Sequence, residues 1–302
     1  MKKQHSALAV IAIAVVLTVS GCSAHTSASM QAAAQPLSQE QFITLQLRES
    51  TSDFAAYLRL QAEQLDGGTA EFAAAYQSGD VALARALYAP TRMFYNRLLV
   101  VRNAFPVLAL KLDGQEAGIP ASAPSAQSAP SAQSAPTGWS AIESDLFPSA
   151  GHVPLTALER TASASALTTD TRALYEQMLG FRPTIDEQTA GAAALLATLG
   201  TEAANGTKDA LSHSGVSDLQ GYVDGARTVF DGVRSVLVTQ DAALATRLDH
   251  QFAAMQDSLN AHRVGVAFVA YDQLSVSDVE SLRSAVADLA ASLAQVAPTM
   301  AL

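Results

Sequence analysis

The sequence predicts an all-α protein built from antiparallel helical bundles, and three observations lead to this prediction. Apolar residues recur every three or four positions over most of the chain, which is the spacing of one face of a helix. No stretch shows the sustained alternation of Val, Ile and Thr that half-buried strands require. Alanine is abundant, and alanine both favours helix formation and lets two helices approach closely. We therefore expect roughly seven or eight helices packed as bundles.

Residues 1–21 have the pattern of a secretory signal peptide. Two lysines precede a short apolar run, and two small residues stand directly before Cys22. A charged start, a short apolar run and a small-residue cleavage site define such a signal, and the run is too short to span a membrane stably. A cysteine as the first retained residue is typical of a bacterial lipobox. We expect Cys22 to be lipidated and the mature protein to be anchored at the extracytoplasmic face of a membrane; the alternative is a plain signal peptide.

Composition narrows the classes of partner. Cys22 is the only cysteine, so no internal disulfide can form and stability must come from burial of apolar surface. The net charge is −10, and the 18 Lys and Arg residues form no basic run. This balance argues against nucleic acid and against an anionic lipid surface as partners. An acidic chain is compatible with cation handling, although most acidic surfaces only keep a protein soluble.

The mature chain divides into a tether, a helical domain and an interruption within that domain. Residues 22–36 are small and polar without periodicity, which predicts a flexible tether. The helical domain is expected over 37–302. A Pro/Ala/Ser-rich loop is expected to interrupt it at 119–137, where residues 122–136 repeat the unit SAPSAQ. A tract of Pro, Ala and Ser cannot bury apolar surface and predicts an exposed, extended loop.

Two helices are expected before this tract. The first begins near Ser38 and continues through a Gly-Gly pair at 67–68. The second is expected over 81–105, with Asp80 as its N-cap. Pro90 is expected to kink or break this second helix, because proline lacks the backbone N–H that a helix interior needs.

Helical patterning resumes after the tract. The last helix is expected over 277–296 with Ser277 or Asp278 as its N-cap, and the segment 267–274 also has helical spacing. The other segments with this spacing are 170–179, 185–204, 216–238 and 241–260.

Three blocks of sequence occur in the order found in one known family. Residues 73–98 read AAAYQSGDVALARALYAPTRMFYNRL, residues 137–147 read TGWSAIESDLF, and residues 212–226 read SHSGVSDLQGYVDGA. They resemble AV-x-AGD-x-AKALYAPTR-x-x-YERIE, TGFHRIEKALW and SHTDLWDFQANVDGA of the EfeO/EfeM branch of the imelysin-like family.

This resemblance implies both a fold and a function. The implied fold is two four-helix bundles packed side by side. The implied function is that of a periplasmic or surface lipoprotein of iron uptake, which binds or delivers iron or another divalent or trivalent cation. The implied partners are a membrane iron permease and a haem peroxidase. Imelysin relatives were once classed as peptidases around a His-x-x-Glu motif, which in the EfeO branch is better interpreted as part of a metal site.

The chain departs from the family at this motif. The motif's histidine aligns with Ser140, so that only Glu143 remains of the pair. Three further acidic positions of the family become Asn96, Leu99 and a residue at 102–103. Hydroxyl, amide and apolar groups supply much less of the charge that holds a hard or borderline cation. We therefore expect a weakened, altered or absent metal site.

Four carboxylates are the candidates for a remaining cation site. Asp113 and Glu116 remain from an acidic segment of the family, Glu143 remains from the motif, and Glu63 lies on the first predicted helix. In the functional interpretation they converge on a low-affinity cation site. In the alternative interpretation they are ordinary surface acids beside an exposed loop.

Other polar residues are expected to have structural roles. His213 is expected to cap or pack at the start of a helix rather than to bind metal, and Asp224 is expected to be structural, with Gly225 allowing close helix packing. No nucleophile–base, zinc-protease, phosphate-loop or haem-attachment motif occurs, so we expect no catalysis. The leading hypothesis is an envelope-anchored, EfeO-like component of iron uptake. The alternative is a diverged scaffold that binds protein or envelope polymer and no metal; a peptidase is disfavoured because the motif histidine is missing.

Overall fold

A computed structural model describes residues 37–114 and 136–300 of the chain. Several predicted features lie outside these residues: the signal peptide 1–21, Cys22, the tether 22–36, Glu116 and most of the tract 119–137. Within the described ranges, no helix is both long enough and apolar enough to cross a membrane.

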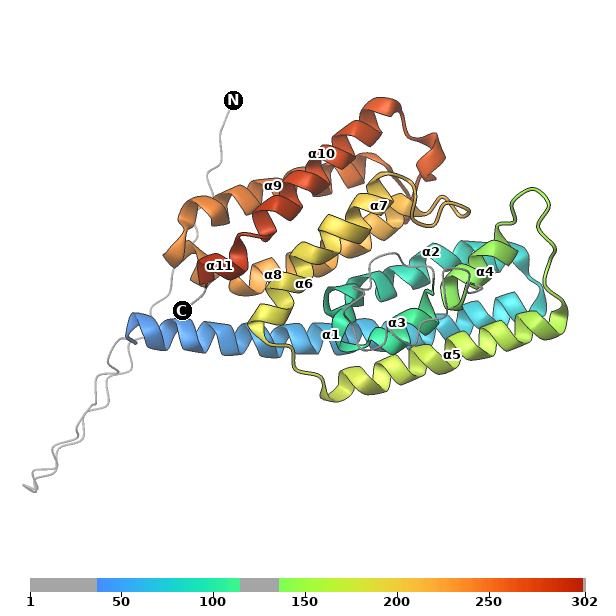
Figure 1. Cartoon of the computed structure of the whole chain (residues 1–302), viewed down its shortest axis with the longest axis horizontal. Coiled ribbons are helices and arrows are strands. Elements are labelled where there is room, and N and C mark those ends of the chain that lie inside the picture. Colours follow the sequence, from blue (N-terminus) through green and yellow to red (C-terminus); the bar gives the residue numbers. More distant parts are fainter. Residues whose placement is uncertain (1–36, 115–135, 301–302) are drawn as a thin grey trace, which may run out of the picture. The chain divides into compact units, whose positions relative to one another are not determined.

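The first group of helices is arranged along one very long helix (Figure 1). Helix α1 is continuous over 40 residues, including the Gly-Gly pair. It begins at a capping box on Ser38 and ends at Gly79, whose φ of 78° lies in the left-handed region. Helices α2 and α5 pack along α1. The elements of this group are α1 (Gln39–Ser78), α2 (Val81–Leu98), α3 (Pro106–Leu112), α4 (Gly138–Leu146) and α5 (Ala157–Gly180).

The second group of helices surrounds α8. Every residue of α8 from Gly215 to Val223 is buried, because this helix packs against α1 and α2 of the first group and against α6 and α9 of the second. The helices of this group are α6 (Ile185–Leu195), α7 (Thr201–Ala204), α8 (Gly215–Gln240), α9 (Ala242–Ala261), α10 (Val276–Leu293) and α11 (Val296–Met300), with a π-helical turn (Leu196–Gly200) between α6 and α7. The two groups confirm the predicted all-α, bundle-like fold.

The predicted helix over 81–105 is correct only in its first part. Helix α2 ends at Leu98 and is followed by a 3₁₀ helix (Leu99–Ala104) with a non-helical residue, Val101. The chain leaves the α conformation before Pro106, since a proline disfavours the α region for the residue that precedes it. Pro90 lies inside α2 without ending it, because packing of α2 against α1 and α8 compensates the single hydrogen bond that proline removes.

The prediction of a helix over 267–274 is wrong. Strand β1 (Arg263–Val264) pairs antiparallel with β2 (Ala267–Phe268), and a 3₁₀ turn (Tyr271–Gln273) follows. Gly265 has a φ of 63° in the turn of this hairpin, a conformation that glycine adopts without strain. The segment is too short for periodicity to separate helix from strand.

The N-cap of the last long helix is Ser275, and neither Ser277 nor Asp278 has that role. The Ser275 hydroxyl accepts a hydrogen bond from the backbone N–H of Asp278 at 3.2 Å, while the Asp278 carboxylate accepts one from the Ser275 backbone at 3.1 Å. Asp278 is therefore the third residue of a capping box. The prediction identified the two interacting residue types and misplaced the start of the helix by two to three residues, which is the usual uncertainty of helix ends.

An aromatic cluster fixes the position of α4. The Trp139 ring is fully buried and lies 5.1 Å from the Phe72 ring of α1 and 5.6 Å from the Tyr88 ring of α2. Aromatic pairs at these centroid distances attract each other in addition to burying large apolar surfaces. Because Trp139 is held in this way, the side chains that follow it on α4 have fixed directions.

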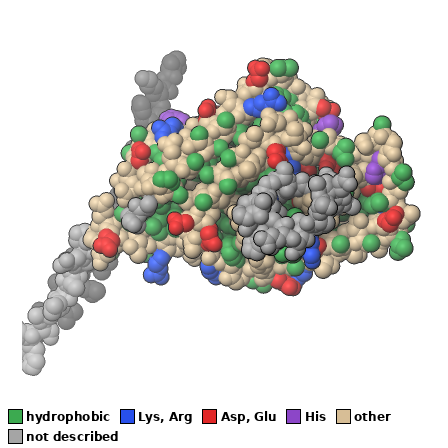
Figure 2. All heavy atoms as spheres, in the orientation of Figure 1, with side chains coloured by type: hydrophobic (Ala, Val, Ile, Leu, Met, Phe, Trp, Pro, Cys, Tyr) green, Lys and Arg blue, Asp and Glu red, His purple; other side chains and the backbone are tan. Residues whose placement is uncertain are grey.

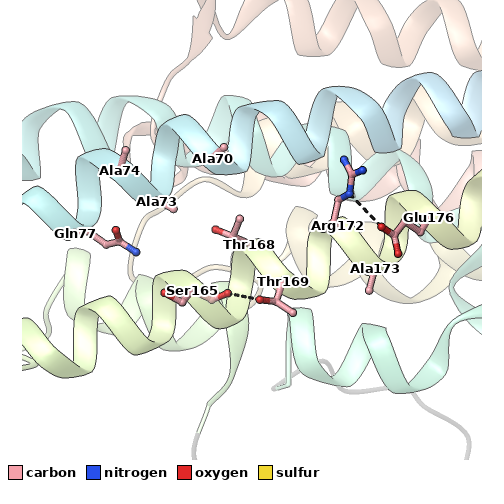
Figure 3. Close-up of a pocket in the computed structure, with 10 residues that line it drawn as sticks. All are labelled: Ala70, Ala73, Ala74, Gln77, Ser165, Thr168, Thr169, Arg172, Ala173 and Glu176. Atoms are coloured by element: carbon pink, nitrogen blue, oxygen red, sulfur yellow. Dashed lines mark hydrogen bonds and ion pairs between the residues drawn. The ribbon is translucent and has the colours of Figure 1, made fainter.

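Small side chains line an open groove between α1 and α5, with a volume of about 720 Å³. Alanines of α1 face hydroxyl side chains of α5 there, and Arg172 and Glu176 of α5 form an ion pair at the same groove (Figure 3). On the described part of the surface shown in Figure 2, acidic side chains are scattered in small groups among polar and apolar ones. Several other charged residues are buried inside the molecule.

Candidate functional site

A cluster of charged side chains lies in the interior, where helices α2, α3, α4 and α8 meet the loop 205–214. All six of its charged residues are buried, which is rare for such residues unless they are paired. Four are carboxylates and two are cations, and we call the cluster the polar centre. Its charged members are Arg92, Asp113, Glu143, Lys208, Asp209 and Asp218.

Arg92 of α2 is the hub of the polar centre. Its Nη2 atom lies 2.7 Å from a carboxylate oxygen of Asp113 and 2.8 Å from one of Asp209, and its Nε atom lies 3.4 Å from Asp218. Burial alone would raise the pKa of Asp113, but the ion pairs with Arg92 and Lys208 outweigh burial and hold this pKa well below its usual range. Asp113 is therefore ionised and compensated inside the protein.

A backbone contact brings the end of α3 to the start of α4. Asp113 forms a bridge with Gly138, and the Thr137 hydroxyl donates a hydrogen bond of 2.7 Å to the Leu110 carbonyl. Gly138 has a φ of 57°, and any side chain there would meet the backbone of α3. The ends of the segment between α3 and α4 are thus held together, and Asp113 accepts a hydrogen bond from the Ser140 hydroxyl of α4.

The loop 205–214 contributes one of the four carboxylates, Asp209, and supplies a contact to each of the other three. Lys208 Nζ lies 2.8 Å from Asp113, and Asp209 pairs with the arginine of α2 as described above. The backbone N–H and the hydroxyl of Ser212 both donate to Glu143, at 2.8 and 2.7 Å. Ser214 donates to Asp218 at 2.8 Å. The loop therefore closes the polar centre from one side.

This loop contains two residues with an unfavourable backbone conformation. Asp209 and His213 have φ values of 48° and 57°, a region that costs non-glycine residues roughly 1–2 kcal/mol each. The surrounding contacts hold both residues there, including a 2.9 Å hydrogen bond from the Tyr271 N–H to the His213 carbonyl. Strain of this kind persists where neighbouring groups over-determine the backbone, and it is concentrated at functional sites.

Asn96 of α2 changes the charge of the centre relative to the family motif. This side chain is fully buried, and its amide donates a 2.5 Å hydrogen bond to Asp218 of α8. The position is acidic in the motif that the chain resembles, and a carboxylate here would face Asp218 and require a cation between them. The neutral amide avoids this second charge, and Arg92 is the cation that lies near Asp218, at 3.4 Å. The neighbouring position Leu99 is also buried and apolar.

The carboxylates on the outer side of the centre are less well compensated. Glu143, Glu202 and Asp209 line a pocket of about 330 Å³ together with Ser140 and Lys208. Burial is the main cause that raises the pKa of Glu143, Glu202 and Asp209, and repulsion from Asp209 adds to the rise at Glu143. Burial therefore disfavours the charged form of these carboxylates, and a positive charge placed beside them would favour their ionised form.

The structure brings together two of the four carboxylates predicted as ligands. Asp113 and Glu143 both belong to the polar centre. Glu63 is exposed on α1 and is not part of the cluster, and Glu116 lies outside the described residues. Within the described ranges, no group of three or more His, Cys, Asp or Glu residues is arranged to hold a metal ion. Asp113 is paired with Arg92 and Lys208 instead, and Glu143 accepts hydrogen bonds from Ser212.

Sequence reasoning did not identify Arg92, Lys208, Asp209 or Asp218 as members of this cluster. One signal was present: Arg92 lies between Tyr88 and Tyr95 at the spacing of a buried helical stripe, so a charge in that stripe required a buried partner. No comparable signal marks the residues of the loop, because their placement depends on its backbone conformation.

Two predicted structural roles agree with the contacts seen. Asp224 accepts hydrogen bonds from Arg97 at 2.8 and 2.9 Å and from Gln220 at 2.7 Å. A Cβ atom on Gly225 would lie 2.9 Å from the Arg97 carbonyl oxygen, so α8 can approach α2 closely only with glycine here. His213 lies just before the N-cap Ser214 of α8, and its Nε2 atom is 3.8 Å from Asp272.

The chain is similar to proteins that are named as components of iron uptake systems. It is 28% identical over 254 residues to the iron uptake system component EfeM of Pseudomonas syringae pv. syringae, covering 82% of this chain and 83% of that protein. It is 28% identical over 253 residues to the iron uptake system component EfeO of Escherichia coli, covering 83% of this chain and 64% of that protein. The match to EfeO of Yersinia pseudotuberculosis is 27% identical and covers 62% of that protein. The chain thus spans most of EfeM and less than two thirds of these EfeO proteins.

The family model described as "Peptidase_M75: Imelysin" matches residues 50–297, which is well over half of the chain. This range includes α2, α4 and α8 and the loop that carries Lys208, so every charged residue of the polar centre lies within it. The chain is therefore a member of the imelysin family.

Proposed function

We propose that this chain is an envelope-anchored component of an iron uptake system that binds or delivers the metal cation. The observation that carries this proposal is the match to EfeM, which extends over 82% of this chain and 83% of the relative. Lipidation of Cys22 and residence at the extracytoplasmic face of a bacterial membrane are part of the proposal, and they rest on the N-terminal sequence pattern. The proposed partner is a membrane iron permease, with a haem peroxidase as a second one.

Within the fold, the pocket side of the polar centre is the place where a cation would enter. Glu143 and Glu202 line this pocket, and burial raises the pKa of both groups, so a cation that enters would favour their ionised form. Oxygen donors of this kind suit hard and borderline cations such as iron. The protein would have no catalytic activity of its own. The lipid anchor would keep it at the membrane and so raise its effective concentration near the permease.

Uptake of radioactive iron by intact cells tests this proposal. A strain that lacks the chain is complemented with the wild type, with Glu143→Gln or with Glu71→Gln. The last is a matched control, because Glu71 is an exposed glutamate on α1. We expect deletion to lower iron uptake, and we expect the wild type and the control, but not Glu143→Gln, to restore it. Iron uptake that is unchanged by deletion would contradict the proposal.

A second candidate is a scaffold of the cell envelope that no longer binds metal. The observation that favours it is the internal compensation of Asp113 by Arg92 and Lys208, at 2.7 and 2.8 Å. In that case deletion would lower iron uptake, but Glu143→Gln would restore it as well as the wild type does. Circular dichroism of the purified variant shows whether it folds, so a misfolded protein is not mistaken for a lost ligand.

A further inference from the structure

The ammonium group of Lys208 lies among the carboxylates of the polar centre. Its Nζ atom is 2.8 Å from Asp113, and the Lys208 side chain is only 7% exposed. It also lines the pocket that Glu143, Glu202 and Asp209 face. A cation of the chain itself therefore lies where the negative charge of the centre is concentrated.

Asp113 has partners other than Lys208. Arg92 pairs with Asp113 at 2.7 Å, and the Ser140 hydroxyl donates to it. Arg92 comes from a helix in the core, whereas Lys208 is carried by the loop 205–214 on a long, flexible stem. A point charge on such a stem can leave a carboxylate and return to it without unfolding a helix.

The strain in the loop indicates that this placement is specific. Lys208 directly precedes Asp209, which is held at a φ of 48°. This conformation is uncommon for a residue other than glycine, and the ion pairs of Lys208 with Asp113 and of Asp209 with Arg92 hold the backbone there. The backbone is thus held so that Lys208 and Asp209 both enter the centre.

We propose that the Lys208 ammonium occupies the position that a metal cation would take in the polar centre, so that this residue decides whether the centre accepts a metal ion. The inference rests on the proposed function, in which that ion is the cargo. A tethered ammonium competes with a free cation for the same oxygens, and it lowers the apparent affinity by the fraction of time that it occupies them. If it is bound ~90–99% of the time, its removal tightens metal binding by ~10- to 100-fold.

Trp139 offers a direct readout of binding at this place. It is the only tryptophan of the chain and is fully buried. It also directly precedes Ser140, whose hydroxyl contacts Asp113. Paramagnetic Fe(II) bound in the polar centre should therefore quench the tryptophan emission.

The experiment is an anaerobic titration of the purified protein with Fe(II), followed by this emission and by calorimetry. Lys208→Met removes the charge, Lys208→Arg keeps it, and Lys111→Met is the matched control, because Lys111 is 57% exposed on α3. We expect Lys208→Met to bind Fe(II) at least tenfold more tightly than the wild type, and both other variants to bind as the wild type does. The double variant Lys208→Met/Glu143→Gln should lose the gain.

Unchanged affinity in Lys208→Met would overturn the inference. If the wild type binds Fe(II) equally tightly and Glu143→Gln abolishes binding, the proposed function stands while the inference falls. If only Lys208→Met binds Fe(II), the inference stands and direct cation binding by the native protein fails. If neither Lys208→Met nor the wild type binds Fe(II), the inference and the proposed cation binding both fail. Thermal unfolding of each variant verifies folding, and Lys208→Gln, which keeps a hydrogen-bond donor for Asp113, replaces Lys208→Met should the latter not fold.

Discussion

Replacement of Arg92 by leucine tests whether the polar centre is compensated from within. Arg92 is fully buried and pairs with Asp113 and Asp209 at 2.7 and 2.8 Å. In the variant Arg92→Leu, Asp113 would keep Lys208 as a partner. Asp218 would keep its hydrogen bonds from an amide and a hydroxyl. Asp209 would lose its close cation, leaving one buried carboxylate uncompensated.

The expected loss of stability follows from that single uncompensated charge. Removal of one partner of a buried ion pair costs about 3–5 kcal/mol. With a urea m-value of about 2–3 kcal/mol per molar, the unfolding midpoint should fall by roughly 1–2.5 M at neutral pH. Burial already raises the pKa of Asp209. The folded variant would therefore bind a proton more readily than the unfolded chain, and its deficit should shrink as the pH is lowered from about 7.5 to about 5.

Urea unfolding followed by circular dichroism at these two pH values measures both effects. Arg172→Leu is the matched control, because Arg172 is a 56% exposed arginine of α5 that pairs with Asp66 and Glu176. Exposed ion pairs contribute little to stability, so the control should unfold at the midpoint of the wild type. Equal shifts for the two variants, or a deficit of Arg92→Leu that does not shrink on acidification, would refute the internal compensation.

Three further predictions concern the centre and the packing around it. Asn96→Asp places a second buried carboxylate against Asp218, whose oxygen now lies 2.5 Å from the Asn96 amide. It should lower the free energy of unfolding by about 3–5 kcal/mol at neutral pH, and a loss below about 1 kcal/mol in urea unfolding would contradict this. Gly225→Ala brings a Cβ atom within 2.9 Å of the neighbouring backbone and should cost about 1–3 kcal/mol. The control Gly67→Ala, with nothing within 4 Å, should stabilise α1 by up to about 1 kcal/mol; thermal midpoints that shift in the same direction would speak against this packing. Because burial raises the pKa of Glu143 from 4.5, the native state holds this proton more tightly than the unfolded chain. Wild-type stability should therefore fall relative to Glu143→Gln as the pH rises from about 4.5 toward neutrality, and parallel pH profiles of the two proteins would exclude that titration.

Local signals were sufficient to predict much of the fold. Asp80 caps α2 as expected, and α1 begins directly after Ser38, near the predicted start. A side-chain hydrogen-bond acceptor just before an apolar periodic run is a local signal for a helix start. The hairpin 263–268 was not predicted, since a two-residue strand gives no measurable periodicity. Likewise, the change from α2 to a 3₁₀ helix after Leu98 has no local sequence signal.

The candidate site was only partly predictable, for a physical reason. Glu143 and Asp113 were found through their place in family-like motifs, and a backbone bridge to Gly138 explains why they share one site. Lys208 and Asp209 were not found, because a left-handed residue in an irregular loop carries them into the core. The conformation of this loop depends on the ion pairs that Lys208 and Asp209 form. The periodicity and spacing of residues in the sequence do not reveal such ion pairs.

Calorimetric titration of the purified protein with Fe(II), Fe(III), Cu(II) and Zn(II) measures most directly whether the polar centre accepts a cation. The wild type is compared with Glu143→Gln, which removes a pocket-facing carboxylate, and with the exposed control Glu71→Gln. We expect a single class of binding site that is lost in Glu143→Gln and retained in the control. No binding heat in the wild type, or equal binding by both variants, would contradict a cation site in the polar centre.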